Sequence, residues 1–320
     1  MKVILTGGAG FIGSCFLQKL NREGITDIII VDHLDELKWK NLLNKKYTDY
    51  IEKEDFLSLL LDEKIKKVDL IVHLGACSST MEKNVSYLIK NNFLYSKEIA
   101  KWAFKNDIRF LYASSAATYG AGENGFDDED ENTRKLKPLN LYGFSKHLFD
   151  LWVISNNLLN KCAGFKFFNV FGPNEYHKGY MRSVVVKAFE EIKTQGKVHL
   201  FKSYREKCSD GEQKRDFVYV KDVVKVMYYF IENPDKNGIF NIGTGKARSF
   251  NDLAGALFSA LEMERKIKYV DMPESILENY QYFTQADLKK LRKVGCPHQF
   301  MELNEAVADY VGYLQEQKYL

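Results

Sequence analysis

Tyr142 and Lys146 stand four residues apart in the segment PLNLYGFSK, residues 138–146, where the pattern predicts the start of a helix. This spacing places both side chains on one helix face. Tyrosine titrates near pH ~10 and lysine slightly higher, so neither group alone is a base at neutral pH. A nearby ammonium favours the phenolate, however, and we expect Lys146 to lower the pKa of Tyr142 into a range suited to acid–base catalysis.

The same pair also has an ordinary interpretation, because a surface lysine beside a half-buried tyrosine is common on helices. The preceding segment, YASSAATYG at 112–120, ends a predicted strand. Ser114, Ser115 or Thr118 could therefore meet Tyr142 at the carboxyl end of a sheet, where ligands bind in open α/β folds. The chemistry of Tyr142 depends on what else lies at this end.

A glycine-rich turn, TGGAGFIGS at residues 6–14, carries Gly7, Gly10 and Gly13 between a predicted strand and a predicted helix. Glycine there permits a tight turn, lets backbone approach a diphosphate and lets the helix pack on the strand. The helix N-terminus adds free N–H groups and a positive dipole. Asp32 ends the next predicted strand at the distance of a ribose-binding carboxylate, so we predict a dinucleotide site rather than a purely structural turn.

The choice of dinucleotide is left open by these residues. Asp32 favours the free ribose hydroxyl of NAD, whereas Lys38 and Lys53 could reach the 2′-phosphate of NADP as point charges. Each lysine also has a simpler interpretation as a solvated surface residue.

Buried runs that alternate with helical patterns must position these groups. We expect strands at 3–6, 27–32, 68–75, 109–115 and 163–170, helices at 11–23, 85–105 and 141–160, and a helix ending in the basic segment KIKK at 64–67. Continuous apolar strands separated by helices predict an α/β fold with a Rossmann-like, doubly wound parallel sheet.

The regular alternation of apolar runs and helical patterns ends after residue 170. We expect a helix near 180–195, a strand at 198–201, a loop at 202–216, a strand and helix at 217–233, a strand at 238–245 and a serine-capped helix at 249–262. This pattern predicts a cofactor-binding Rossmann domain over residues 1–170, to which 217–248 return. An interleaved, smaller α/β substrate domain would comprise residues 171–216 and 249–320.

Composition argues against several classes of function. A net charge of +3 gives nucleic-acid binding no electrostatic support. No stretch approaches the ~20 apolar residues of a membrane span. The five cysteines are widely spaced, so we expect free thiols in a reducing cytoplasm and no metal site. They are Cys15, Cys77, Cys162, Cys208 and Cys296.

Several segments together carry a family resemblance. TGGAGFIG, HLGA (73–76), SSAATYG and YGFSK are typical of the extended short-chain dehydrogenase/reductase superfamily. The resemblance is narrowed by GACSST (75–80), NN (91–92), FLYASSAATYG (110–120), FNVFGPNEYHKGYMRSV (168–184), KRDFVYVKDV (214–223), FNIGTGKARSF (240–250) and YQYFTQADL (280–288). Over nearly its whole length the sequence resembles the ADP-L-glycero-D-manno-heptose 6-epimerases.

The resemblance implies a nucleotide-sugar isomerase with tightly held NADP, NAD being the less favoured cofactor. It implies an ADP-heptose substrate, inverted at C6″, for the inner core of lipopolysaccharide. It also implies a cytoplasmic homo-oligomer, such as a pentamer or another ring.

Individual site positions follow from the same resemblance. It implies cofactor contacts at Gly7, Gly10, Phe11, Ile12, Gly13, Asp32, His33, Lys38, Lys53, Leu74, Gly75, Ala76, Cys77, Ser78, Asn91, Lys146, Val170 and Lys178. It implies substrate contacts at Asn169, Tyr180, Lys187, Phe201, Lys202, Ser203, Tyr204, Arg215 and Tyr280. Leu74, Tyr180 and Lys187 differ in type from the residues expected there. Arg215 could instead pair with the adjacent Asp216.

Epimerisation through a ketone removes hydride from one face of the carbon and returns it on the other, so the hydroxyl oxygen occupies two places. One acid–base residue cannot easily serve both. By the resemblance, Tyr142 serves one epimer and Lys178 the other, with Lys146 and Ser115 assisting Tyr142. A catalytic lysine needs desolvation or a neighbouring cation, for which His177 and Lys146 are candidates.

Two other interpretations remain. A UDP-sugar 4-epimerase or 4,6-dehydratase shares the fold, but a 4-epimerase would not need Lys178. A dehydratase usually has an acidic pair where this chain has Ala116 and Ala117. A non-catalytic nucleotide-binding regulator would be expected to lack Tyr142 or Lys146. Finally, His73 lies inside an apolar strand and is expected to be a core histidine rather than a catalyst.

Overall fold

Seven strands form one sheet in the computed structural model, which describes residues 1–277 and 280–320. Their order is β11-β6-β5-β4-β1-β2-β3, and all neighbours run parallel. The strands are β1 (Val3–Thr6), β2 (Ile28–Asp32), β3 (Asp49–Glu52), β4 (Leu70–His73), β5 (Arg109–Ser115), β6 (Cys162–Phe167) and β11 (Gly238–Ile242). The predicted doubly wound α/β fold is confirmed.

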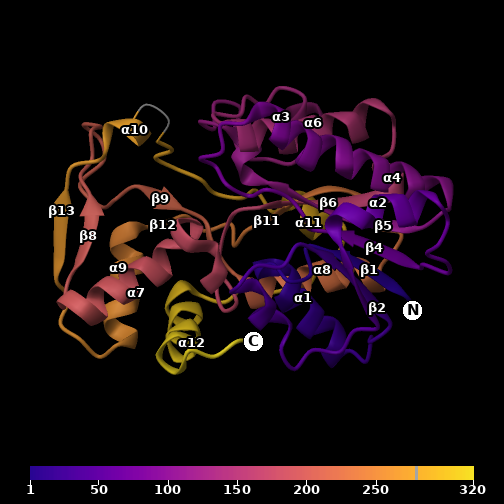
Figure 1. Cartoon of the computed structure of the whole chain (residues 1–320). Helices are drawn as coiled ribbons and strands as arrows, with labels where there is room; N and C mark the ends of the chain where they lie inside the picture. Colours follow the sequence, from indigo (N-terminus) through magenta and orange to yellow (C-terminus); the bar gives the residue numbers. More distant parts are fainter. Residues whose placement is uncertain (278–279) are drawn as a thin grey trace.

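Helices cover both faces of this sheet (Figure 1). Alternation along β1 explains why, since Val3 and Leu5 pack into one apolar core while Ile4 packs into another on the opposite face. The first face carries α1 (Phe11–Arg22) and α8 (Val220–Glu232). The second carries α2 (Lys53–Leu61), α4 (Tyr95–Lys105) and α6 (Leu141–Ser155). The short helix α3 (Val85–Leu88) and the π-helical turn η2 (Ile89–Leu94) precede α4.

A smaller group of elements lies beside the sheet, on the left of Figure 1. It comprises α7 (Val184–Gln195), β8 (Val198–Phe201), β9 (Lys214–Arg215), β12 (Arg248–Ser249), α9 (Phe250–Ala260), β13 (Ile267–Val270) and α10 (Glu274–Leu277). Distant segments pair here, β8 with β13 and β9 with β12. The chain continues through α11 (Lys289–Lys293) to α12 (Leu303–Glu316), which packs on α9.

The chain rejoins the large sheet at β11. β11 lies beside β6, and β10 (Phe217–Tyr219) pairs with β7 (Asn169–Phe171) in a separate parallel ladder. The domain boundaries themselves stay a prediction. The remaining short elements are η1 (Lys38–Leu42), η3 (Ala116–Tyr119), α5 (Asp130–Thr133), η4 (Leu159–Lys161) and η5 (Tyr176–Met181).

Several predicted boundaries are wrong, each for a local reason. The edge strand β3 was not expected, because its exposed segment lacks a continuous apolar run. The helix expected to end in KIKK ends at Leu61, and the helix of 141–160 ends at Ser155, before Asn157 with φ +55°. The fifth strand ends at Phe167, because Asn169–Phe171 turns to pair with β10.

Two other expectations are met. Ser249 forms a capping box with Asp252 at the start of α9. All five cysteines are free thiols. None of the helices in the described part of the chain is both long and apolar enough to cross a membrane.

Candidate active site

The glycine-rich turn closes tightly onto its own backbone. Gly7 has φ +70°, which favours glycine, and a Cβ on Gly13 would lie 2.0 Å from the Gly7 carbonyl oxygen. Gly10 is the N-cap of α1 and offers no side chain to the free N–H groups of the first helical turn. Because this end of α1 borders a cavity, the turn forms a cradle suited to a diphosphate.

That cavity has a volume of about 690 Å³ and lies at the carboxyl ends of the strands. The strand order reverses there, between β1 and β4, as at the usual ligand site of an open α/β sheet. Most of the expected cofactor positions line it: Gly7, Gly10, Phe11, Ile12, Gly13, Asp32, Lys38, Leu74, Gly75, Ala76, Cys77, Ser78, Lys146, Val170 and Lys178. The residues present therefore fit a dinucleotide.

Asp32 organises one end of the cavity. Its carboxylate accepts hydrogen bonds from the backbone N–H groups of Ala9 and His33, both at 2.8 Å. The Lys38 ammonium contacts the same carboxylate and the His33 carbonyl. Asp32 thus ties the glycine turn to the end of β2 and holds one cation at the cavity wall.

Three expected cofactor residues do not line the described cavity. The Lys53 ammonium bonds the Asn91 side-chain oxygen, and the His33 side chain is exposed. His33 also approaches Glu52 and Glu54 closely enough for the three to share an ion. These groups are exposed, and exposed carboxylates commonly gather without a metal, so we assign no metal site.

Helix α6 brings Tyr142 and Lys146 to the cavity. Asn140 caps the helix by accepting the Gly143 N–H at 2.8 Å, so the predicted helix start is confirmed. Ser115, at the end of β5, lines the same cavity. Burial lowers the pKa of Lys146 to about 8, although the carboxylate of Asp150 opposes the shift.

The predicted lowering of the Tyr142 pKa is wrong for this structure. Burial raises the pKa of Tyr142, because it withdraws the phenolate from water, and the neighbouring Ser115 hydroxyl only partly opposes this. Lys146 is itself desolvated, so less than a full positive charge remains beside the phenol near pH 8.

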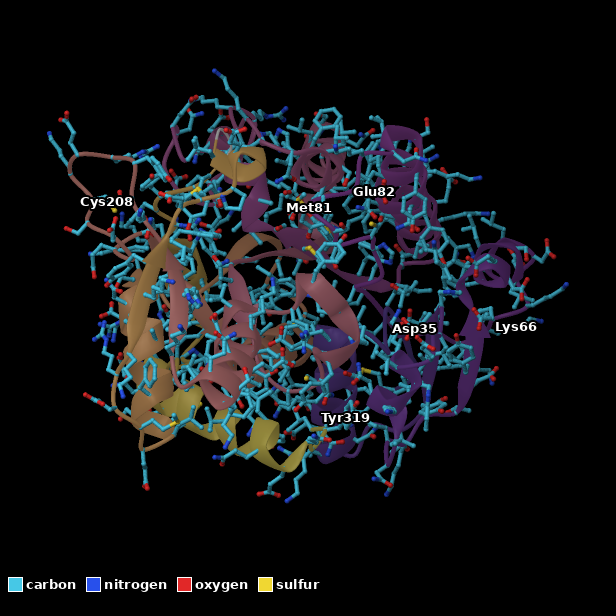
Figure 2. The ribbon with its side chains drawn as sticks, turned by 60° about the vertical axis from the view of Figure 1, so that its left-hand side comes forward. Asp35, Lys66, Met81, Glu82, Cys208 and Tyr319 are labelled. Carbon is cyan, nitrogen blue, oxygen red and sulfur yellow. The ribbon has the colours of Figure 1, made fainter. Side chains whose placement is uncertain are left out.

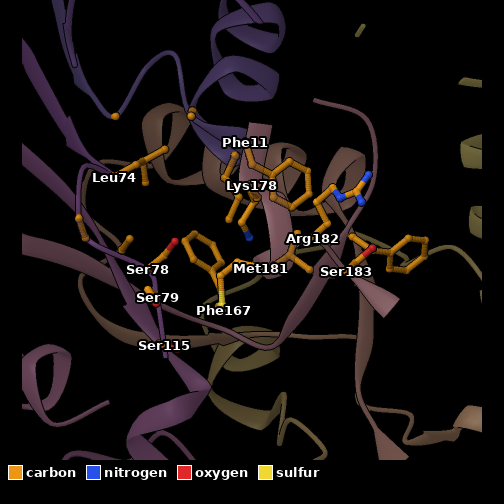
Figure 3. A pocket seen from close by; sticks show the side chains of 18 of the residues that line it. Phe11, Leu74, Ser78, Ser79, Ser115, Phe167, Lys178, Met181, Arg182 and Ser183 are labelled. Carbon is orange, nitrogen blue, oxygen red and sulfur yellow. The ribbon is translucent and has the colours of Figure 1, made fainter. Parts of the chain in front are cut away.

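Lys178 reaches the cavity from the short helical segment η5, and Figure 3 shows its ammonium directed into the cavity beside Phe11. Burial lowers the pKa of Lys178, while Glu175 opposes and Lys187 assists the shift. We expected His177 or Lys146 as the assisting cation. His177 instead stays neutral, because burial lowers its pKa to about 4.

A buried carboxylate fixes the loop that carries Lys178. Glu175 accepts the Gly172 N–H at 3.2 Å, the Ser183 hydroxyl at 2.7 Å and the Tyr310 hydroxyl at 3.1 Å. These bonds tie both ends of the loop to α12. Gly179, next to Lys178, has φ +53° and kinks the segment.

Two of the expected substrate positions, Asn169 and Tyr180, line the cavity. Arg215 lies farther along, 5.2 Å from the ring centroid of Tyr280 and 5.7 Å from that of Phe250, a lining residue. The alternative pairing of Arg215 with Asp216 is not found. Asp216 accepts hydrogen bonds from Thr244, Gly245 and Ala286 instead.

The other expected substrate positions, Lys187, Phe201, Lys202, Ser203 and Tyr204, do not line the described cavity. The side chains of Lys202 and Tyr204 both bond Asp271, at 3.1 and 3.0 Å. Figure 2 shows the loop beyond them, with Cys208, projecting at the opposite end of the molecule from Asp35, which lines the cavity.

Sequence reasoning missed several lining residues, among them Asp35, Ser79, Phe167, Met181, Arg182, Phe217 and Phe250. Met181 and Arg182 adjoin Lys178 in one segment, so their proximity to it was a usable signal. Phe217 reaches the cavity because β10 pairs with β7, which sets it opposite Asn169. Phe250 gave no signal, because the packing of α9 against α7 and α12 brings it to the cavity. The Ser79 and Tyr180 hydroxyls lie 3.0 Å apart and join two loops that border the cavity.

His73 is a core residue, as expected. Its Nδ1 bonds the Thr6 hydroxyl at 2.7 Å and its Nε2 bonds the Ser96 hydroxyl at 2.8 Å. Burial, followed by the Lys146 charge, lowers its pKa to about 3. It therefore stays neutral and connects β4 to α4 rather than exchanging protons.

Comparison with known proteins places these features in context. The sequence model of the NAD dependent epimerase/dehydratase family matches residues 3–243. A Nitratidesulfovibrio vulgaris protein named ADP-L-glycero-D-manno-heptose-6-epimerase is 50% identical over 310 residues, which cover 96% of each chain.

Two solved structures superpose on nearly the whole molecule. A Helicobacter pylori ADP-L-glycero-D-manno-heptose-6-epimerase matches with a TM-score of 0.83 and 26% identity, covering 98% of this chain and 96% of that chain. A Methanobrevibacter ruminantium UDP-N-acetylglucosamine 4-epimerase matches with a TM-score of 0.84 and 27% identity, covering 99% of both chains.

Proposed function

The chain belongs to the NAD dependent epimerase/dehydratase family, and we propose that it interconverts ADP-D-glycero-D-manno-heptose and ADP-L-glycero-D-manno-heptose. It does so by epimerisation at C6″ with NADP, and supplies heptose for the inner core of lipopolysaccharide. The observation that carries the proposal is that Tyr142, Lys146 and Lys178 line one cavity with the glycine turn. The 50% identity to a protein of that name supports the substrate.

The chain's own residues would hold the cofactor in a fixed place. The glycine turn and the open N-terminus of α1 would bind a diphosphate. Asp32 would lie beside the adenosine ribose, whose 2′-oxygen carries a phosphate in NADP, and could accept only the hydroxyl that remains free. Lys38 supports NADP over NAD, because its ammonium lies beside Asp32 at the cavity wall. When bound, NADP would take up hydride from C6″ and return it.

Two side chains manage the proton of the C6″ hydroxyl. Tyr142 protonates or deprotonates this oxygen in one pose of the sugar tail, and Lys178 does so in the other. Burial lowers the pKa of Lys178, which suits it to this role, because a desolvated lysine releases its proton more readily. Ser115 assists by hydrogen bonding near Tyr142.

A UDP-sugar 4-epimerase is the alternative, since a protein of that activity has a similar fold. A 4-epimerase keeps the reacting oxygen near one base, however, and leaves Lys178 without a function. We also propose that the protein is a cytoplasmic homo-oligomer. Light scattering of the purified protein would measure its oligomeric state.

The deciding experiment offers the purified protein ADP-D-glycero-D-manno-heptose, UDP-glucose and UDP-N-acetylglucosamine in parallel, with products separated by chromatography. Mass spectrometry of the small molecules released on denaturation identifies the cofactor. We expect conversion of the ADP-heptose alone and release of NADP. Conversion of a UDP-sugar in its place would overturn the substrate, and release of NAD would overturn the cofactor.

A further inference from the structure

A buried ion pair lies behind the acid–base helix. The Lys166 ammonium on β6 and the Asp150 carboxylate on α6 are 2.8 Å apart, and both side chains are 0% exposed. Lys166 also donates to the Thr118 hydroxyl at 2.8 Å. Neither member of the pair lines the described cavity, so contact with a ligand does not explain it.

The Asp150 carboxylate accepts hydrogen bonds from two side chains of β5, the strand that ends at Ser115. It accepts the Tyr112 hydroxyl at 3.1 Å and the Ser114 hydroxyl at 2.7 Å. Tyr112 is seated over Gly164, where a Cβ would lie 2.3 Å from its ring. The carboxylate thus fastens α6 to β5 at the level of the residue before Ser115.

Lys166, the cation of the pair, is linked to Ser115 through Thr118. The Thr118 hydroxyl that accepts from Lys166 donates to the Ser115 carbonyl at 2.8 Å. Ser115 in turn caps the short η3 helix, accepting the Ala117 N–H at 3.1 Å. The ion pair is therefore linked to the Ser115 carbonyl through Thr118, and to the preceding residue, Ser114, through Asp150.

Asp150 is also aligned with the acid–base pair. Tyr142, Lys146 and Asp150 are spaced four residues apart, so they occupy successive turns on one face of α6, with Cβ atoms of neighbours about 5–6 Å apart. Lys146 and Asp150 are both buried, and little solvent screens their interaction.

We propose that Asp150 is a positioning residue of the reaction: its carboxylate supplies the counter-charge of the Lys146 ammonium and joins α6 to the strand that presents Ser115. The inference rests on the proposed function for its catalytic meaning. The charge state of Lys146 can nevertheless be measured without turnover, so the two proposals fail separately.

The other groups around Lys146 do not provide this counter-charge. His73 on β4 stays neutral, because its pKa is about 3. Tyr142 on α6 is a neutral acid at pH 7, because burial raises its pKa. Lys166 on β6 carries the opposite sign to the one needed. Among the described residues, the Asp150 carboxylate is the charge that raises the pKa of Lys146 against the lowering by burial.

A purely structural role is the competing explanation, and charge-neutral variants separate the two. Asp150→Asn keeps the shape, but it leaves Lys166 buried and unpaired and endangers folding. The double variant Asp150→Asn/Lys166→Met removes both charges and relieves that cost. Thr118→Val is the matched control, because it disrupts the same network and keeps both charges.

The readouts are the titration of Lys146, followed by NMR in protein labelled with 13C at lysine Cε, and the pH profile of kcat. Lys146→Arg assigns the signal. In the double variant we expect a stable fold, but a Lys146 titration and an alkaline limb of kcat shifted to lower pH by about one unit. Thr118→Val should lower the melting temperature without moving the titration. A double variant that titrates like the wild type would overturn the proposal, as would an equal shift in Thr118→Val.

Discussion

The Lys178 ammonium lies 5.4 Å from the ring centroid of Phe11, the first residue of α1. This contact places a lysine from the loop after β7 beside the helix whose N-terminus borders the cavity. Tyr142 enters the same cavity from α6. The two groups that we propose as acid–base residues thus approach one cavity from separate elements, as the proposed inversion through a rotated ketone requires.

Lys178→Met and Tyr142→Phe should each lower kcat for epimerisation by ~10²- to 10⁴-fold, the usual effect of removing a general acid or base. Both changes keep side-chain volume, so the folded structure should persist. Initial rates of ADP-heptose conversion measure the effect, and absorbance of the bound cofactor checks that the site is still loaded.

Matched changes far from the cavity test whether loss of a charge or hydroxyl alone matters. Lys193→Met removes an exposed lysine of α7, and Tyr47→Phe removes an exposed phenol. Both should turn over at the wild-type rate. Full activity in Lys178→Met would reduce the mechanism to a single base, and full activity in Tyr142→Phe would remove the tyrosine from it.

Lys146 should give the enzyme an alkaline limit. Burial lowers its pKa to about 8, so the ammonium is progressively lost as pH rises above 8, and kcat should fall with it. The guanidinium of Lys146→Arg stays charged, so this variant should be slower overall but keep its plateau to higher pH. A wild-type profile flat to pH 10 would contradict the assignment.

Deprotonation of Lys146, which should lower kcat, should raise the free energy of unfolding. The pKa of Lys146 is lower when folded than the ordinary 10.5, so the unfolded chain binds more protons between these values. The free energy of unfolding therefore gains a contribution as pH rises from about 8 to 10.5. Urea unfolding curves measure this effect. The free energies of unfolding of wild type and Lys146→Met should approach each other as pH rises across this window.

Local patterns were sufficient to predict the sheet and the cofactor turn. Continuous apolar runs such as 28–32 and 109–115 become strands buried on both faces, and Gly7, Gly10 and Gly13 shape their turn through neighbouring backbone. Strand β3 escaped prediction, because its edge position leaves it half exposed. The chain topology, rather than local composition, recruits such a strand.

The outer parts of the site depended on contacts that no local pattern encodes. Phe250 reaches the cavity because α9 packs against α7 and α12. The pKa of Tyr142 was predicted in the wrong direction, because spacing reveals the neighbouring lysine but not the burial of both groups. Lys53 matched a cofactor position by resemblance, yet it bonds Asn91 outside the described cavity.

Gly13→Ala should abolish cofactor binding and lower the melting temperature. The new Cβ would lie 2.0 Å from the Gly7 carbonyl oxygen, and backbone cannot yield there without opening the turn. Gly312→Ala in α12 is the matched control, since no atom lies within 4 Å of its added Cβ. It should raise the free energy of unfolding by ~0.5–1 kcal/mol. Unfolding curves and cofactor content measure both effects, and a loaded Gly13→Ala protein would refute the cradle.

The hydrogen bond between Tyr180 and Ser79, which both line the cavity, should slow release of the cofactor. Their hydroxyls lie 3.0 Å apart and link the loop after β4 to the segment that carries Lys178. Tyr180 is 65% exposed, so the bond is worth only ~0.5–1 kcal/mol against water. Tyr180→Phe should therefore speed cofactor release by ~2- to 5-fold, measured by stopped-flow fluorescence.

Ser79→Ala tests whether this effect belongs to the bond or to the tyrosine ring. It removes the same bond from the opposite loop and leaves the aromatic surface in place, so it should speed release equally. The double variant should then be no faster than either single one, because the second change has no bond left to break. Multiplying effects would instead show that each side chain acts independently, and that the two loops open without having to separate from each other.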